Sequence, residues 1–197
     1  MKRELDEYLC KVYPKMMVNR DKDMKETCMC WGFEVGRGWF QILNQLMSNI
    51  QHHIDWSIHN RDIAIAYNEM ITQCKAGDYT LFEERYKDIK PENQEWKAKH
   101  LKDIIEGDLK TIPDVVPQVT LDQVKEKFGT LRFYYSGGDD RIRGMVSMAE
   151  SMSSVTCEEC GKPGTSTGGG WIKTVCKEHG GVDYDTPEDE LVNDSAV

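Results

Sequence analysis

The sequence has no long hydrophobic run. One of the longest, Ile-Ala-Ile-Ala-Tyr at positions 63–67, is far shorter than the ~20 apolar residues that span a bilayer. The first seven residues lack the apolar segment of a secretory signal peptide. The sequence contains no motif of a nucleotide-binding glycine loop, a nucleophile elbow or a metalloprotease helix. The seven cysteines are an odd number with no repeated disulfide spacing, which favours a reducing compartment. We therefore expect a cytoplasmic protein with no membrane partner.

The sequence does contain two short pairs of metal-ligand residues. Two residues separate Cys157 from Cys160, two separate Cys176 from His179, and a glycine-rich stretch lies between the pairs. This spacing lets a tight turn present two ligands to one tetrahedral ion, as in a zinc ribbon. We predict a structural Zn2+ site, because four protein ligands leave no open position for a catalytic water. The alternatives are two disulfides or a set of buried thiols.

The predicted ribbon spans about residues 156–180, with a short strand at 171–175 leading to its second ligand pair. A segment of this length buries too little apolar surface to order itself, so metal binding would order it. A zinc-deaminase site requires a His-x-Glu sequence, which is missing from the chain, so we exclude that enzyme.

The net charge of −9 is unevenly distributed. Residues 180–197 contain six acids and no lysine or arginine, so residues 1–179 carry only −3 of the total. We expect residues 181–197 to form a solvated, disordered acidic tail. Nucleic-acid binding is disfavoured, since its affinity comes from clustered cations against phosphates.

Helical periodicity dominates the first 110 residues. An N-terminal helix and a polar linker are predicted for residues 1–27, followed by an α+β core at 28–155. The core begins with a helix at about 39–56, whose buried stripe is Phe40, Leu43, Met47, Ile50 and Ile54. Further helices at about 61–75, 79–89 and 91–106 form a helical insertion at 60–110.

A β-hairpin is predicted for residues 124–135, with a tight turn or bulge at Gly129. Alternation places one set of side chains on one face, namely Phe128, Thr130, Arg132 and Tyr134, and a second set on the other, namely Leu131, Phe133 and Tyr135. The face with Arg132 has two possible environments. It either exposes an aromatic–arginine surface that could stack bases, or it is buried like the other face, and Lys125, Lys127 and Arg132 extend their charged ends to water. A helix then begins near Asp139 and Asp140, whose carboxylates suit the positive helix end. Its buried stripe is Ile142, Met145, Val146, Ala149 and Met152.

These motifs resemble small proteins of tailed phages, prophages and bacterial genomes. Six motifs carry the resemblance. The first four are Trp31-Gly32-Phe33, Gly36-x-Gly38-Trp39-Phe40, Gln123-Val124-Lys125-Glu126-Lys127-Phe128-Gly129-Thr130-Leu131-Arg132-Phe133-Tyr134 and Met148-Ala149-Glu150-Ser151-Met152-Ser153. The last two belong to the ribbon and are Cys157-x-x-Cys160-Gly161-x-Pro163-Gly164 and Gly170-Trp171-Ile172-x-Thr174-x-Cys176-x-x-His179. It covers roughly residues 28–58 and 115–180. It implies a mobile, often viral, genetic context and no particular reaction.

Cys28 and Cys30 form a second candidate metal pair. One intervening residue places both thiols on the same side of an extended segment. They would need further ligands, such as Cys74 or one of the histidines His52, His53 and His59. The alternative is two buried thiols. For the same three histidines, spacing identifies no serine, cysteine or carboxylate partner for acid–base chemistry.

The sequence thus predicts an α+β protein with a helical N-terminal half and insertion, a β-hairpin platform with a helix, and a C-terminal zinc ribbon. We expect a non-enzymatic phage-type accessory protein that binds and modulates a host protein. The predicted working surface is Trp31, Phe33, Trp39, Arg132 and Tyr134, since aromatic and arginine side chains dominate interface energies. The alternatives are a sponge for a nucleotide-like small molecule and a zinc-ribbon regulator that binds nucleic acid.

Overall fold

The computed structural model describes residues 1–182, so the expected acidic tail lies outside the described residues from position 183 onward. The chain forms two compact units: unit 1 contains residues 1–54 and 116–182, and unit 2 contains residues 55–115. Helices and small sheets are mixed, as in the predicted α+β class. None of the helices within 1–182 combines the length and apolar character needed to cross a bilayer.

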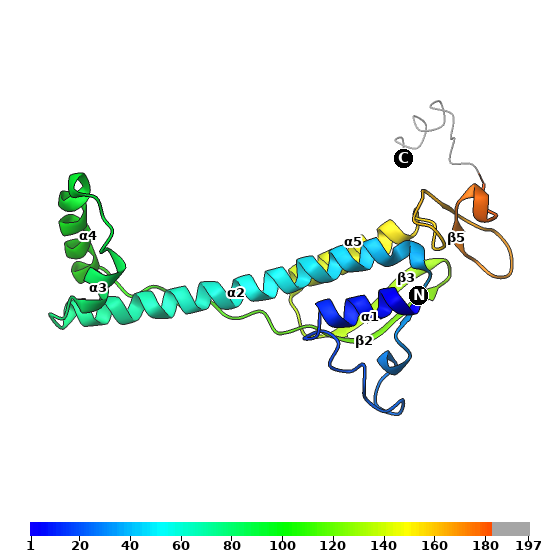
Figure 1. The fold of residues 1–197 in the computed structure, drawn as a ribbon, viewed down its shortest axis with the longest axis horizontal. Coiled ribbons are helices and arrows are strands. Elements are labelled where there is room, and N and C mark those ends of the chain that lie inside the picture. The colour runs from blue at the N-terminus through cyan, green and yellow to red at the C-terminus, as the bar shows by residue number, and fades with distance from the viewer. Residues whose placement is uncertain (183–197) are drawn as a thin grey trace, which may run out of the picture. The chain divides into compact units, whose positions relative to one another are not determined.

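Unit 1 is built on a three-stranded sheet with the order β1-β2-β3. Strand β1 (Phe33–Glu34) is parallel to β2 (Thr120–Lys127), and β2 is antiparallel to β3 (Thr130–Ser136). Helix α1 (Arg3–Val12), the first part of α2 (Phe40–Lys75) and α5 (Asp140–Ser153) share one hydrophobic core with this sheet (Figure 1). The largest fully buried side chains of this core include Trp39, Leu9, Met16, Met29, Leu43, Met47, Ile50, Ile54, Leu121 and Leu131.

The register of the hairpin confirms the predicted alternation. Leu131 and Phe133 are buried in the core, whereas Lys125 lies opposite Arg132, and Gln123 opposite Tyr134, on the other side of the sheet. We call this second side the outer face; its residues are Glu34 of β1 and Gln123, Lys125, Lys127, Thr130, Arg132 and Tyr134 of the hairpin. It is partly exposed to solvent, so the hairpin is not buried on both sides.

Helix α5 also closes the free edge of β3. The backbone N–H of Leu131 donates to Ser153 Oγ at 2.8 Å, and that of Phe133 donates to Glu150 Oε1 at 3.0 Å. At the opposite edge, the N–H of Phe33 in β1 donates to Asp6 Oδ1 at 3.1 Å. Side chains therefore satisfy edge groups that would otherwise be free to pair with another strand.

Helix α2 differs from the sequence prediction. The two helices expected at 39–56 and 61–75 are one continuous helix of 36 residues, Phe40–Lys75. The intervening residues 57–60 contain no glycine or proline, so nothing in this stretch breaks the helix. It ends before Gly77, whose φ of +86° is the left-handed conformation of a glycine C-cap.

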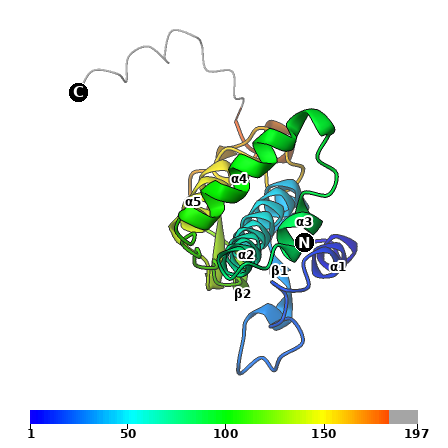
Figure 2. The same cartoon turned by 90° about the vertical axis from the view of Figure 1, so that its left-hand side faces the viewer.

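Unit 2 consists of the end of α2 with α3 (Thr80–Arg85) and α4 (Gln94–Glu106), the latter preceded by a 3-10 turn at Pro91–Asn93. Figure 2, which looks along α2, shows both short helices beside its C-terminal end. They bury a small core made of Met70, Ile71, Cys74, Phe82 and Ile104. Asn68 fixes the extended segment that follows α4, because its amide exchanges two hydrogen bonds with the backbone of Lys110.

The last described segment is a small ribbon. Its two strands, β4 (Thr165–Ser166) and β5 (Thr174–Val175), are antiparallel and precede a 3-10 turn at Lys177–His179. The strand expected at 171–175 is therefore shorter than predicted. Trp171 lies outside it, on the loop that joins the two strands, and is 75% exposed.

Candidate metal centre and the sheet surface beside it

The four predicted metal ligands meet in the ribbon. Sγ of Cys157, Cys160 and Cys176 and a ring nitrogen of His179 all lie within 4.8 Å of one another. His179 Nδ1 is 3.5 Å from Cys157 Sγ and 3.2 Å from Cys176 Sγ, and Cys160 Sγ is 3.7 Å from Cys176 Sγ. A disulfide would require ~2.05 Å between sulfurs, and all seven cysteines are free. The cluster fits a metal ion and rules out the disulfide alternative in this structure.

Backbone hydrogen bonds build each half of the site. The first half is a tight turn in which the Gly161 N–H donates to the Cys157 carbonyl at 2.8 Å, with Gly161 at a φ of +80°. In the second half, the His179 N–H donates to the Cys176 carbonyl at 2.9 Å. Burial of the Cys157 thiol opposes its ionisation, but surrounding backbone N–H groups, chiefly that of Cys176, lower its pKa to about 7. The thiolate form that metals bind is therefore favoured at Cys157. At Cys160 the Lys162 N–H lowers the pKa, but burial and the neighbouring Cys157 and Cys176 thiols outweigh it, so the pKa of that thiol is raised.

The glycine-rich segment before α2 is the support of this centre. The N–H of Gly36 donates to the Glu158 carboxylate at 2.8 Å, and the N–H of Gly38 donates to the Glu158 carbonyl at 2.7 Å. A Cβ added at Gly38 would collide with the Cys157 carbonyl oxygen, so only glycine permits this approach. The indole N–H of Trp39 completes the contact by donating to the Thr156 carbonyl at 2.8 Å.

These contacts correct the predicted working surface. Trp39 is fully buried beneath the metal centre, and Phe33 is buried on the inner side of β1, opposite Val124. Neither side chain is available to a partner, because both are part of the hydrophobic core. Trp31 is 58% exposed, while Arg132 and Tyr134 lie on the outer face of the hairpin.

The hairpin turn packs against the metal ribbon. Thr174 Oγ1 donates to the Gly129 carbonyl at 2.6 Å, and a Cβ added at Gly129 would lie 3.1 Å from Ile172 Cγ2. The turn consists of Phe128 and Gly129, with φ values of +55° and +77°. The Phe128 side chain is 69% exposed at this tip. The sequence prediction places Phe128 in a strand, on the same face as Arg132 and Tyr134, whereas the structure places it in the turn between β2 and β3.

Cys28 and Cys30 do not form a second centre in the described part of the chain. Within residues 1–182, the ribbon cluster is the one place where three or more potential ligands come within metal-binding distance. Cys30 Sγ instead contacts the Thr27 carbonyl oxygen at 3.2 Å, and Cys28 is exposed. The predicted shared ion finds no support here, because none of the described residues supplies a third ligand to this pair.

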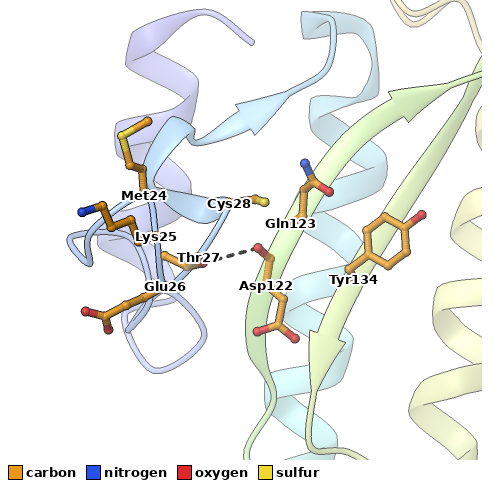
Figure 3. Close-up of a pocket in the computed structure, with 8 residues that line it drawn as sticks. All are labelled: Met24, Lys25, Glu26, Thr27, Cys28, Asp122, Gln123 and Tyr134. Carbon is orange, nitrogen blue, oxygen red and sulfur yellow. Dashed lines mark hydrogen bonds between the residues drawn. The ribbon is translucent and has the colours of Figure 1, made fainter.

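Cys28 lines a hollow of about 420 Å³ beside the outer face. Figure 3 shows the residues 24–28 on one side and side chains of β2 and β3 on the other. A hydrogen bond connects the two sides, because Thr27 Oγ1 donates to the Asp122 carbonyl at 3.4 Å. The lining residues are Met24, Lys25, Glu26, Thr27, Cys28, Asp122, Gln123 and Tyr134. Tyr134 therefore belongs both to this hollow and to the outer face.

The structure contains a histidine–carboxylate pair that the sequence does not predict. His53 Nε2 of α2 lies 2.8 Å from Asp139 Oδ2, while Asp139 Oδ1 accepts the N–H of Ile142 as the N-cap of α5. The predicted capping role of Asp139 is thus confirmed. Although partial burial opposes its ionisation, the hydrogen bond from His53 keeps the pKa of Asp139 below its ordinary value. No spacing rule reveals the pair, because its members are far apart in the sequence.

The chain matches no protein-family model, no curated protein and no solved structure.

Proposed function

We propose that Cys157, Cys160, Cys176 and His179 hold a structural zinc ion. Zinc bonds of ~2.3 Å to sulfur and ~2.0 Å to nitrogen give tetrahedral edges of about 3.8 Å between sulfurs and about 3.5 Å between sulfur and nitrogen. The distances of 3.7, 3.5 and 3.2 Å within the cluster are close to these edges. Three thiolates and one imidazole suit zinc, and all four positions are taken by the protein.

The ribbon depends on this ion for its order. Its buried apolar cluster consists of Cys157, Val175 and Cys176, so two of the three members are metal ligands. One valine cannot offset the entropy of ordering some two dozen residues. Binding of zinc, worth roughly 10–16 kcal/mol in zinc-finger peptides, supplies the missing stabilisation.

We further propose that the protein is a non-enzymatic, phage-type accessory protein of the host cytoplasm that binds and modulates a host protein. The observation that carries this proposal is the exposure of Trp171, at 75%, on a loop whose two ends are held by the metal ribbon. Exposed tryptophans on rigid supports are frequent anchors of protein interfaces. Trp31, 58% exposed, is a second such side chain.

A small-molecule sponge is the second candidate function. It is favoured by the hollow beside Tyr134, whose volume of about 420 Å³ falls in the range of ligand sites. Thr27, Asp122 and Gln123 would supply hydrogen bonds to a ligand, and the Tyr134 ring would supply a flat wall.

Native mass spectrometry of protein purified without chelator tests these proposals together. One zinc per chain with no further mass supports the structural site, whereas zero zinc contradicts it. A retained adduct of a few hundred daltons would favour the sponge. Host-protein binding is then tested by affinity capture with the wild type, Trp171→Ala and the matched surface variant Lys22→Glu. Loss of one captured protein in Trp171→Ala alone supports the proposal, and unchanged capture in all three contradicts it.

A further inference from the structure

The outer face of the hairpin contains an unfavourable charge pair. Lys125 and Arg132 are direct cross-strand partners on the same side of the sheet, and like charges in this position are destabilising. Neither they nor Lys127 forms an ion pair with a carboxylate of residues 1–182. Within the part of the chain that the structure describes, the guanidinium of Arg132 donates a hydrogen bond only to the adjacent Leu131 carbonyl, at 2.8 Å. The nearest acid in the register, Glu34, accepts a hydrogen bond from the Gln123 amide instead.

A second unfavourable feature lies at the tip of the same hairpin. Phe128 occupies the left-handed conformation, with φ of +55°, in a two-residue turn where asparagine or glycine is normal. Its ring gains little from burial in return, because it is 69% exposed. Backbone strain and an exposed aromatic ring together have no explanation in the stability of the fold. Local conflicts of this kind concentrate at functional sites.

The cations and rings of this surface alternate. Lys125 Nζ lies 5.5 Å from the centroid of the Tyr134 ring, and Lys127 Nζ lies 5.5 Å from that of Phe128. Arg132 stands between these two pairs on the neighbouring strand. A ligand with anionic groups next to flat rings would relieve the repulsion between Lys125 and Arg132 and cover both aromatic side chains.

From this arrangement we propose that the outer face of β2 and β3, with Phe128, binds single-stranded nucleic acid. Phosphates would contact Lys125, Lys127 and Arg132, and unpaired bases would stack on Phe128 and Tyr134. Duplex DNA offers no free base faces to these rings, so single strands are preferred. This binding goes beyond the proposed capture of a host protein and does not depend on it.

The overall negative charge is less of an obstacle than the sequence total indicates. Unit 2 contains 13 acids and 9 bases, and residues 183–197 contain six more acids. The described residues of unit 1 contain 16 lysines and arginines against 15 acids. The acidic excess therefore belongs to other parts of the chain than the one that carries the outer face.

Fluorescence anisotropy with a labelled oligothymidylate of about 12 nucleotides tests this inference on the zinc-loaded full chain. We expect binding at about 50 mM salt, and contacts by three cations predict a log–log salt slope of about −2. Arg132→Glu should weaken binding at least about tenfold, and Phe128→Asn at least about fivefold through the lost stacking. Asparagine tolerates the left-handed turn, so Phe128→Asn keeps the fold while it removes the ring.

The matched controls are Lys22→Glu, an exposed cation elsewhere in unit 1, and Trp56→Ala, an exposed aromatic residue of α2 that belongs to unit 2. Both should bind as the wild type does. The inference is overturned by absence of binding at low salt, or by equal losses in the controls and the hairpin variants. It is also overturned if polyglutamate of similar length competes equally and Phe128→Asn has no effect, since the surface would then recognise acidic peptides by charge alone.

Discussion

The backbone N–H of Gly38 donates a hydrogen bond of 2.7 Å to the carbonyl oxygen of Glu158, a residue that lies between Cys157 and Cys160 of the candidate metal site. This contact joins the start of α2 to the metal turn. Arg37 strengthens the junction, because its Nε donates to the Glu159 carbonyl at 3.1 Å. The metal ribbon is therefore a part of unit 1 that rests on the core and not a separate appendage.

We expect Gly38→Ala to destabilise the protein by at least ~2 kcal/mol, because the new methyl group meets backbone atoms of the metal turn that cannot move away. The matched control is Gly144→Ala in α5, where an added Cβ meets nothing within 4 Å. The free energy of unfolding of that variant should rise by up to ~1 kcal/mol, because alanine has a higher helix propensity than glycine. Urea unfolding of both variants measures the contrast, and similar values for the two would refute the proposed role of Gly38.

Removal of zinc should unfold the ribbon and leave the rest of unit 1 folded. Hydrogen exchange before and after a chelator is expected to show loss of protection at residues 156–182, with protection retained in α2 and β3. Cys160→Ser should reproduce the change without a chelator, since three ligands hold zinc poorly. Cys28→Ser, at an exposed cysteine outside the cluster, should leave both zinc content and exchange unchanged. A ribbon that stays protected after verified zinc removal would contradict this dependence.

Phe128→Asn should stabilise the fold by about 1 kcal/mol, because asparagine adopts the left-handed conformation at lower cost. Thermal unfolding measures the change, and Phe128→Ala serves as the control that removes the ring and keeps the strain. If the asparagine variant is more stable than the alanine variant, the destabilisation at position 128 comes from backbone strain and not from the ring. No difference between the two would show that the turn is unstrained.

The pair formed by His53 and Asp139 predicts a pH dependence of stability. Because the pKa of Asp139 is lowered in the folded protein, its contribution is complete above the usual carboxyl pKa of ~3.9 and is lost as the pH falls through the lowered value. Asp139→Asn keeps an N-cap acceptor for Ile142 and removes the charge, so it should flatten stability against pH in this acid range. Denaturant midpoints between about pH 2.5 and 5 test this. Wild type and variant curves that stay parallel would rule the pair out as the cause.

The parts of the fold that the sequence reveals are those set by local chemistry. Metal ligands must be two residues apart to reach one ion from a tight turn, so the spacing of Cys157 and Cys160 is informative by itself. Strand alternation likewise separates Leu131 from Arg132, as the register of the hairpin confirms.

Features that depend on distant packing were out of reach of the sequence. An aromatic residue beside glycines, such as Trp39, fits an exposed interface as well as a buried support, and only the position of Thr156 decides between them. The pairing of His53 with Asp139 has the same origin, since it depends on where α2 meets the start of α5. The short polar stretch after Trp56 predicts a helix boundary, but no residue there breaks the helix, so α2 is continuous.

The closure of β3 by Ser153 and Glu150 has a consequence for solubility. An unprotected edge strand is a template for polymerisation, and an exposed apolar side chain such as Phe128 nearby would increase that hazard. Because the N–H groups of Leu131 and Phe133 are bound to α5, they are not free to donate to the strand of another molecule. The chain can therefore keep an aromatic tip in water without inviting fibril growth along the sheet.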